Sequence, residues 1–236
     1  MQAPGEAELL VLWERCLVRH PIDRALLFCA WARPDLTPAQ LPDLPLGMLN
    51  RSLLELREIC FGPHISAYID CEHCRERLEL TLDTRQLFSN INQSDIQAEF
   101  EVSGFRFRLP CSRDLAGISI ENNIETATLK LLKHCCLEYP NENAPNFSGI
   151  MAEVEMAMET LDPATDINLA LACEECGHHW VAELDIGALL RDEIDSRARA
   201  LLAEVDSLAR AYGWTEPEVL ALSAQRRAVY LNMVSE

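Results

Sequence analysis

The sequence lacks the features that would direct it into a membrane or out of the cell. No apolar run approaches the roughly 20 residues that a bilayer-spanning helix needs. The N-terminus also has no basic stretch followed by an apolar segment, because Glu6, Glu8 and Glu14 interrupt that pattern. These absences predict a cytoplasmic protein that makes no contact with a membrane.

Positive charge is scarce as well. The chain has 20 Lys and Arg against 38 Asp and Glu, which gives a formal net charge of -18 at pH 7. Such a surface repels the phosphate backbone of nucleic acids. Nucleic-acid binding, a common role of proteins with paired cysteines, is therefore disfavoured by charge.

Recognisable catalytic motifs are missing. The chain contains no GxSxG, P-loop, GxGxxG or HExxH pattern. Asp192 and Glu193 form an acidic pair that fits a solvated helix face. Cys135 and Cys136 lie beside His134, but nothing in the sequence activates them as nucleophiles. We therefore predict that the protein is not an enzyme and takes no small-molecule substrate.

Cysteine, in contrast, is abundant: the chain has ten, and four of them form two CxxC pairs. Cys71 and Cys74 form the first pair and Cys173 and Cys176 the second, each between two predicted strands. A CxxC turn lets two sulfurs reach one ion, and zinc prefers tetrahedral sets of thiolates or imidazoles. The missing signal peptide and the 49% hydrophobic content argue against a secreted disulfide framework. We predict one structural zinc ion held by these four cysteines.

Other interpretations of the cysteines stay open. A redox dithiol would place a single CxxC at a helix N-terminus, whereas both pairs here lie between strands. His73, His178 or His179 could replace a ligand, although four thiolates already complete the set. Another thiophilic ion could take the place of zinc. The six other cysteines fall mostly in apolar stripes and are expected to pack as small hydrophobes. They are Cys16, Cys29, Cys60, Cys111, Cys135 and Cys136.

The two CxxC segments match beyond their cysteines when they are aligned at an offset of 102 residues (173 minus 71). Asp83 then falls on Asp185, and each is predicted to cap the start of a helix. Gly177 suits the left-handed position that follows such a turn, whereas Arg75 occupies this position in the first copy. The match predicts an internal duplication of a strand, a knuckle, a second strand and a helix start.

The hydrophobic periodicity predicts an α+β fold. Residues 1–63 form a predicted N-terminal helical unit, whose last helix ends at Gly62-Pro63. Residues 64–185 form a predicted zinc-ribbon-like β core, and residues 186–236 form a predicted C-terminal helical segment.

The predicted β core carries a large insertion. Strands on either side of Ser103-Gly104 predict a β-hairpin over residues 97–109. A helical insertion is predicted over 111–163, including one helix over 124–137. Two stretches are predicted as polar loops. They are residues 89–96 and 141–148.

Short motifs spread along the whole chain resemble those of one family, the small baseplate proteins of T-even-type contractile phage tails and of phage-tail-like contractile injection systems. Besides the CxxC units, the motifs that carry the resemblance are His20-Pro21, Leu44-Pro45-Leu46-Gly47, Phe61-Gly62-Pro63, Asp185-Ile186-Gly187, Tyr212-Gly213-Trp214-Thr215-Glu216 and Arg226-Arg227-Ala228 with Tyr230. The resemblance implies a non-catalytic role in assembling the baseplate or its hub, as a component or as a chaperone. It implies baseplate, hub or spike proteins as partners, and incorporation into a tail-like particle.

The C-terminal helices are the predicted contact surface. Trp214, Arg226, Arg227 and Tyr230 are of the types that anchor protein interfaces. The alternative for Trp214 and Tyr230 is that they pack the helices together. Two further functions stay open from the sequence: a zinc-ribbon regulator that contacts nucleic acid or a transcription complex, and a redox or metal-dependent enzyme.

Overall fold

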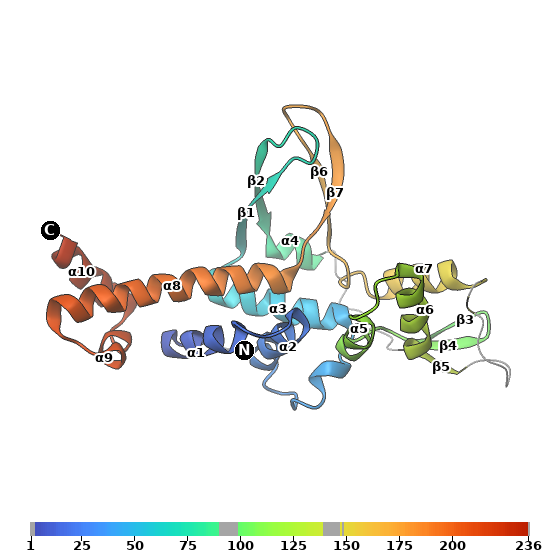
Figure 1. Ribbon diagram of the computed structural model, residues 1–236, viewed down its shortest axis with the longest axis horizontal. Coiled ribbons are helices and arrows are strands. Elements are labelled where there is room, and N and C mark those ends of the chain that lie inside the picture. The colour runs from blue at the N-terminus through green and yellow to red at the C-terminus, as the bar shows by residue number, and fades with distance from the viewer. Residues whose placement is uncertain (1–2, 90–98, 139–146, 148, 236) are drawn as a thin grey trace. The chain divides into compact units, whose positions relative to one another are not determined.

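The computed structural model describes residues 3–89, 99–138, 147 and 149–235 (Figure 1). Its fold is a mixture of helices and small antiparallel sheets, which confirms the α+β class. The chain divides into two compact units. Unit 1 comprises Pro21–Ile186, and unit 2 comprises Gln2–His20 together with Gly187–Glu236.

This division differs from the one that the sequence predicts. The first helix belongs with the C-terminal helices and not with the rest of residues 1–63. The reason lies in contacts that join distant parts of the chain. The Trp13 indole N–H donates to Asp195 at 2.8 Å, and Glu6 pairs with Arg227 near the end of the chain. Periodicity cannot reveal such contacts.

The helical part of unit 1 contains α2 (Pro21–Ala32), a short 3-10 helix (Leu41–Asp43) and α3 (Leu46–Phe61). Helices α2 and α3 pack against each other. Helix α3 ends as predicted, because Gly62 takes a left-handed φ of 86° and its N–H donates to the Glu58 carbonyl. The buried Arg57 guanidinium then donates to the carbonyls of Gly62 at 2.6 Å and His64 at 2.7 Å. These bonds fix the path of the chain into the first hairpin.

The start of α3 is also tied to a distant segment of unit 1. The Asp162 carboxylate, which is buried, accepts a hydrogen bond from the Gly47 N–H at 2.9 Å. A side chain at position 47 would meet this carboxylate, because a Cβ there would lie 1.7 Å from Asp162 Oδ1. The Asn50 amide donates to the carbonyls of Ala164 and Thr165. These bonds hold the chain at the entrance to the second hairpin.

The two CxxC segments form two separate antiparallel hairpins. The first pairs β1 (His64–Asp70) with β2 (Arg77–Asp83), and the second pairs β6 (Asn168–Ala172) with β7 (His179–Glu183). In each strand exposed residues alternate with more buried ones, so that each hairpin has one apolar face. Helix α4 (Thr84–Ser89) follows β2. As predicted, the Asp83 carboxylate caps its start by accepting from the Arg85 N–H at 2.9 Å.

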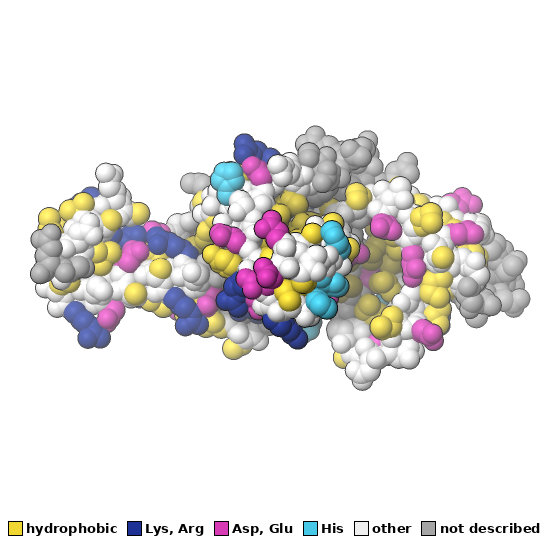
Figure 2. All heavy atoms as spheres, turned by 90° about the horizontal axis from the view of Figure 1, so that it is seen from above, with side chains coloured by type: hydrophobic (Ala, Val, Ile, Leu, Met, Phe, Trp, Pro, Cys, Tyr) yellow, Lys and Arg dark blue, Asp and Glu magenta, His cyan; other side chains and the backbone are white. Residues whose placement is uncertain are grey.

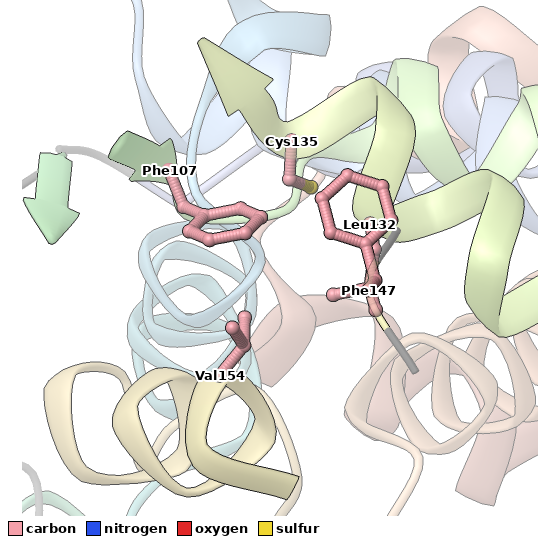
Figure 3. Close-up of a cluster of buried hydrophobic side chains, with 5 residues drawn as sticks. All are labelled: Phe107, Leu132, Cys135, Phe147 and Val154. Carbon is pink, nitrogen blue, oxygen red and sulfur yellow. The ribbon is translucent and has the colours of Figure 1, made fainter. Parts of the chain in front are cut away.

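The insertion between the hairpins has its own small core (Figure 3). It contains the three-stranded sheet β3-β4-β5, with strands Glu99–Val102, Phe105–Arg108 and Cys136–Glu138. Three helices belong to it, α5 (Ser112–Ile118), α6 (Ile124–Cys135) and α7 (Met151–Leu161). The core residues converge from β4, α6, α7 and the chain before α7. They are Phe107, Leu132, Cys135, Phe147 and Val154.

The sequence predicts this insertion in part. The hairpin around Ser103-Gly104 is confirmed over its described residues, with Ser103 at φ 51° and Gly104 at φ 78°. The helix predicted over 124–137 instead ends at Cys135, because Cys136 starts a strand that pairs with β4. Apart from Ser89 and Phe147, the predicted polar loops at 89–96 and 141–148 lie outside the described residues.

Unit 2 consists of α1 (Glu6–Cys16), α8 (Ile186–Tyr212), α9 (Glu216–Leu220) and α10 (Ala224–Ser235). Gly213 ends α8 with a left-handed φ of 72°, and Thr215 and Glu218 form the predicted capping box of α9. Among the described helices, including the 27-residue α8, none combines the length and apolar character that crossing a membrane requires.

Candidate metal centre

The two CxxC turns have the same backbone geometry. In the first, the Cys71 N–H donates to the Glu76 carbonyl at 2.8 Å, and the Arg75 N–H donates to the Cys71 carbonyl at 2.9 Å. In the second, the Cys173 N–H donates to the His178 carbonyl at 2.9 Å, with a further 2.8 Å bond from the Gly177 N–H to the Cys173 carbonyl. Each hairpin therefore presents its two sulfurs from the same kind of turn.

The residue after the second cysteine is left-handed in both turns, at φ 65° for Arg75 and φ 69° for Gly177. Glycine adopts this conformation without a steric penalty, whereas a residue with a Cβ pays roughly 1–2 kcal/mol. The first turn thus keeps the required geometry at a conformational cost that the second turn avoids. This is the difference that the sequence predicts between the two knuckles.

The hairpins bring all four predicted ligands to one point. The sulfurs of Cys71, Cys74, Cys173 and Cys176 all lie within 4.8 Å of one another. Across the hairpins, the sulfurs of Cys71 and Cys176 are 3.7 Å apart, and those of Cys74 and Cys173 are 3.6 Å apart. The first cysteine of each pair is buried and the second is exposed.

This spacing fits a four-coordinate metal site. Metal–sulfur bonds of about 2.3 Å in a tetrahedron place the sulfurs about 3.8 Å apart. The two printed cross-hairpin separations agree with this value to within about 0.2 Å. These two separations, with all four sulfurs within 4.8 Å of one another, suit a metal ion held by the four cysteines.

The electrostatics of the cluster also favour a cation. The backbone N–H groups of Cys74 and His73 lower the pKa of Cys71 to about 7. The Glu76 N–H acts in the same direction on Cys74, but partial desolvation and the other three thiols raise its pKa to about 12. The pKa of Cys176 is also raised. One thiolate forms easily in the cluster, whereas several together need a positive ion between them.

The neighbouring histidines stack and do not join the cluster. The ring of His73 lies 5.7 Å from that of His178, which in turn lies 5.7 Å from the ring of Trp180. Among the described residues, the group with metal-ligand spacing contains the four cysteines alone. Figure 2 looks onto the hairpins from above and shows histidine, acidic and basic side chains around them. The ring stack of His73, His178 and Trp180 thus spans the two hairpins next to the CxxC turns.

The other cysteines behave as packing residues. Burial raises the pKa of Cys29 to about 11 and that of Cys135 to about 12. Cys16 and Cys111 are also buried, and Cys60 and Cys136 are half-buried. Burial likewise raises the pKa of Cys111. The thiols of Cys29, Cys111, Cys135 and Cys136, whose pKa is raised by burial, stay protonated at neutral pH and are poor nucleophiles.

One buried polar group in unit 1 escapes the sequence analysis. Arg108 donates two hydrogen bonds to Asp114, at 2.6 and 2.8 Å, and the Cys111 N–H donates to the same carboxylate at 2.9 Å. Burial alone would raise the pKa of Asp114, but these bonds lower it. The sequence signal is an Asp three residues after the helix cap, which is where an acidic side chain bonds back to the cap N–H.

The four predicted partner-binding residues have different environments in unit 2. Trp214 and Tyr230 are half-buried, and their rings lie 4.9 Å apart, edge to face. Trp214 also stacks on Tyr212 at 4.7 Å. Arg226 is exposed. Arg227 is only 1% exposed, so it does not lie on the surface where the sequence analysis placed it.

Arg227 instead joins three helices of unit 2. Its guanidinium, on α10, donates to Glu204 on α8 at 2.7 Å and to Glu6 on α1 at 2.6 Å. Arg197 on α8 donates to the same two carboxylates, at 3.3 Å to Glu204 and at 2.8 Å to Glu6. Burial alone would lower the pKa of Arg227, but the two carboxylates raise it. We call these four residues the charge cluster.

Comparison with family models, with curated proteins and with solved structures found no match for this chain.

Proposed function

We propose that one structural zinc ion, held by Cys71, Cys74, Cys173 and Cys176, staples the two hairpins together, and that the hairpins are copies of one duplicated unit. The observation that carries this proposal is the set of four sulfurs within 4.8 Å of one another. Zinc fits better than other ions because it favours four tetrahedral thiolates, and four protein ligands leave no open position for catalysis.

The proposed role of the stapled protein is non-catalytic scaffolding or assembly of a contractile tail-like baseplate through protein–protein contacts. The support comes from the resemblance of the short sequence motifs and from exposed aromatic, arginine and apolar residues on unit 2. The acidic net charge of -18 favours protein partners over nucleic acid. In the first hairpin, Arg77 is paired with Asp70, which lowers the charge available to a phosphate backbone.

The metal assignment is tested by measuring metal content on the purified chain. We expect one zinc per chain by mass spectrometry, and loss of that zinc together with a large loss of soluble protein in Cys173→Ser. The control is Cys136→Ser, which changes a half-buried cysteine outside the cluster and should keep the zinc. A stable Cys173→Ser protein with no bound metal in either form would refute the staple.

The assembly role is tested separately by deleting the gene and imaging the particles. We expect missing or unsheathed particles after deletion, and recovery when the intact chain is supplied. We also expect hub or spike proteins to co-purify with the tagged chain. Normal assembly of particles without the protein would exclude the baseplate role and leave the zinc assignment untouched.

A further inference from the structure

The four cysteines at the hairpin tips form two close pairs, and each pair joins one hairpin to the other. We call Cys71, Cys74, Cys173 and Cys176 the cysteine cluster. The sulfurs of Cys71 and Cys176 lie 3.7 Å apart, and those of Cys74 and Cys173 lie 3.6 Å apart. A disulfide bond is about 2.05 Å long, so the sulfurs of each pair need to approach by roughly 1.6 Å to form one. Two disulfides between the hairpins are therefore within reach of the side chains.

Each close pair combines an exposed cysteine with a buried one. Cys176 is exposed and its neighbour Cys71 is buried, and likewise Cys74 is exposed whereas Cys173 is buried. An oxidant dissolved in water therefore reaches one sulfur of each pair first. The buried sulfur then lies where it can attack the oxidised one from the opposite hairpin. Redox-sensing cysteines have this arrangement, in which an accessible thiolate lies next to a resolving thiol.

Contacts that do not involve sulfur also hold the two hairpins opposite each other. Helix α3 bonds to the chain at the entrance of both hairpins, through Arg57 for the first and through Asn50 for the second. At the tips, the rings of His73 and His178 stack at 5.7 Å, one from each hairpin. Oxidation that begins in this arrangement therefore acts on sulfurs whose close neighbours belong to the other hairpin.

We propose that the cysteine cluster is a peroxide-sensitive switch, in which oxidation expels the zinc ion and replaces it with the disulfides Cys71–Cys176 and Cys74–Cys173. This deepens the proposed function and rests on it for the reduced state, in which zinc holds the four sulfurs. The hairpins stay joined in both states, by the metal when reduced and by covalent bonds when oxidised. Disulfides within each CxxC turn would instead leave the hairpins unlinked.

The reaction uses two molecules of hydrogen peroxide per chain. The thiolate of Cys176 attacks one peroxide oxygen, which breaks the O–O bond, forms a sulfenic acid and releases hydroxide. The thiolate of Cys71 then attacks the sulfenic sulfur, forms the S–S bond and expels a second hydroxide. The same two steps oxidise Cys74 and Cys173. Four thiolates thus give up four electrons to two peroxides, which become four hydroxides, and the zinc ion dissociates because it has lost its thiolate ligands.

The test oxidises the zinc-loaded full chain with two equivalents of hydrogen peroxide and maps the disulfides by mass spectrometry. Free thiols are alkylated before digestion, so that the disulfides do not exchange. A protease that cleaves after glutamate separates the two cysteines of each turn, because Glu72 lies within the first turn and Glu174 and Glu175 lie within the second. The digest therefore distinguishes the three pairings that four cysteines allow.

The expected products are two pairs of linked peptides, each with one peptide from each hairpin. Cys60 shares a peptide with Cys71, so Cys60→Ser is the matched control and should give the same links. A chain that is denatured and chelated before oxidation provides the reference for links within each turn, because the shortest loop then closes most easily. The expected links join residues 59–72 to 176–183 and residues 73–76 to 160–174.

Zinc release and hairpin protection are measured on the same samples. We expect a colorimetric indicator to detect release of the bound zinc as the disulfides form, and dithiothreitol with added zinc to restore the metal. Amide hydrogen exchange in β1, β2, β6 and β7 should be at least about tenfold slower in the oxidised, metal-free chain than in the reduced, chelated chain. This comparison shows whether the disulfides keep the hairpins joined.

Three outcomes would overturn the inference. They are any other pairing of the four cysteines, the absence of disulfides after treatment of the zinc-loaded chain, and exchange in the hairpins that is as fast after oxidation as after chelation. The zinc content of the reduced chain is measured first, so that the two proposals fail separately. One zinc per chain followed by disulfides within the turns removes the switch alone. A stable reduced chain that binds no zinc removes the staple, whatever its disulfide map.

Discussion

The two units of this protein join distant parts of the chain by different physical means. In unit 1, the hairpin tips meet at four sulfurs, and Cys71 and Cys176 are 105 residues apart in sequence. In unit 2, the buried guanidinium of Arg227 donates a hydrogen bond to Glu6, which lies 221 residues earlier in the sequence. Under the zinc proposal the first connection depends on an ion that a chelator can remove, whereas the second depends on side chains. One chain would then contain one long-range link that metal removal opens, the cysteine cluster, and one that metal removal leaves intact, the charge cluster.

Metal removal should break this comparison most strongly. Structural zinc contributes about 10–16 kcal/mol in small peptide sites, so its loss should open the hairpin pair. Chelation at pH 7 should increase amide hydrogen exchange in β1, β2, β6 and β7. Exchange within the helices of unit 2 should stay unchanged, because the charge cluster contains no metal ligand. Equal loss of protection in both units would contradict this independence.

Arg227→Ala should destabilise unit 2 and leave the cysteine cluster of unit 1 unaffected. It removes a buried cation from two carboxylates, whose remaining ion-pair partner among the described residues is Arg197. We expect a loss of about 3 kcal/mol in the free energy of unfolding. Arg226→Ala, which changes the exposed neighbour, should cost less than about 0.5 kcal/mol. Denaturant unfolding measures both. The zinc content of Arg227→Ala should equal that of the parent chain.

Asp114→Asn tests whether a charge pair inside unit 1 behaves like the charge cluster of unit 2. Loss of the bonds to Arg108 should cost about 2 kcal/mol at pH 7. Because the folded-state pKa of Asp114 is lowered, its contribution is complete above the ordinary pKa near 4 and is lost as pH falls through the lowered value.

The difference in unfolding free energy between the parent chain and Asp114→Asn should therefore be constant from pH 7 to about pH 4 and shrink below it. Any release of metal on acidification affects both proteins and cancels in this difference. A difference that stays constant down to pH 2 would show that Asp114 has no lowered pKa.

The smallest expected effect compares the two hairpins with each other. Arg75→Gly should stabilise the protein by about 1 kcal/mol, because the position is left-handed. Gly177→Ala should destabilise it by about the same amount, although the space around this Cβ is open. Chemical denaturation of the zinc-loaded chain measures both. A loss of stability in Arg75→Gly would mean that the arginine side chain contributes more than its backbone costs.

The sequence predicts those features that depend on local spacing. Each CxxC pair fixes its own turn, and alternating apolar residues fix the adjoining strands, so the hairpins and their four clustered cysteines could be predicted together. Gly62 and Gly213 likewise mark helix ends, because each takes a positive φ that favours glycine and ends the helix. These features need only a few neighbouring residues.

The features that the sequence did not reveal depend on distant partners. Arg226 and Arg227 are adjacent, yet one is exposed and the other is buried, because successive helix positions point about 100° apart. Which of them faces inward depends on Glu6 and Glu204. In the same way, Cys136 forms a strand because β4 lies beside it, although the periodicity before it continues as a helix.

The assembly of unit 2 from both ends of the chain has a consequence for its synthesis. Helix α1 is made before the other described helices, but Arg227, which closes the charge cluster around Glu6, is made 221 residues after Glu6. At about 5–20 residues per second, this delay is roughly 10–40 s. During that time the helices that complete unit 2 are not yet all made. The apolar side chains of α1 that are buried in the folded protein therefore lack part of their packing partners; they are Leu9, Leu10 and Leu12. Unit 2 therefore cannot complete its charge cluster until α10 has been made, although α1 precedes every other described helix.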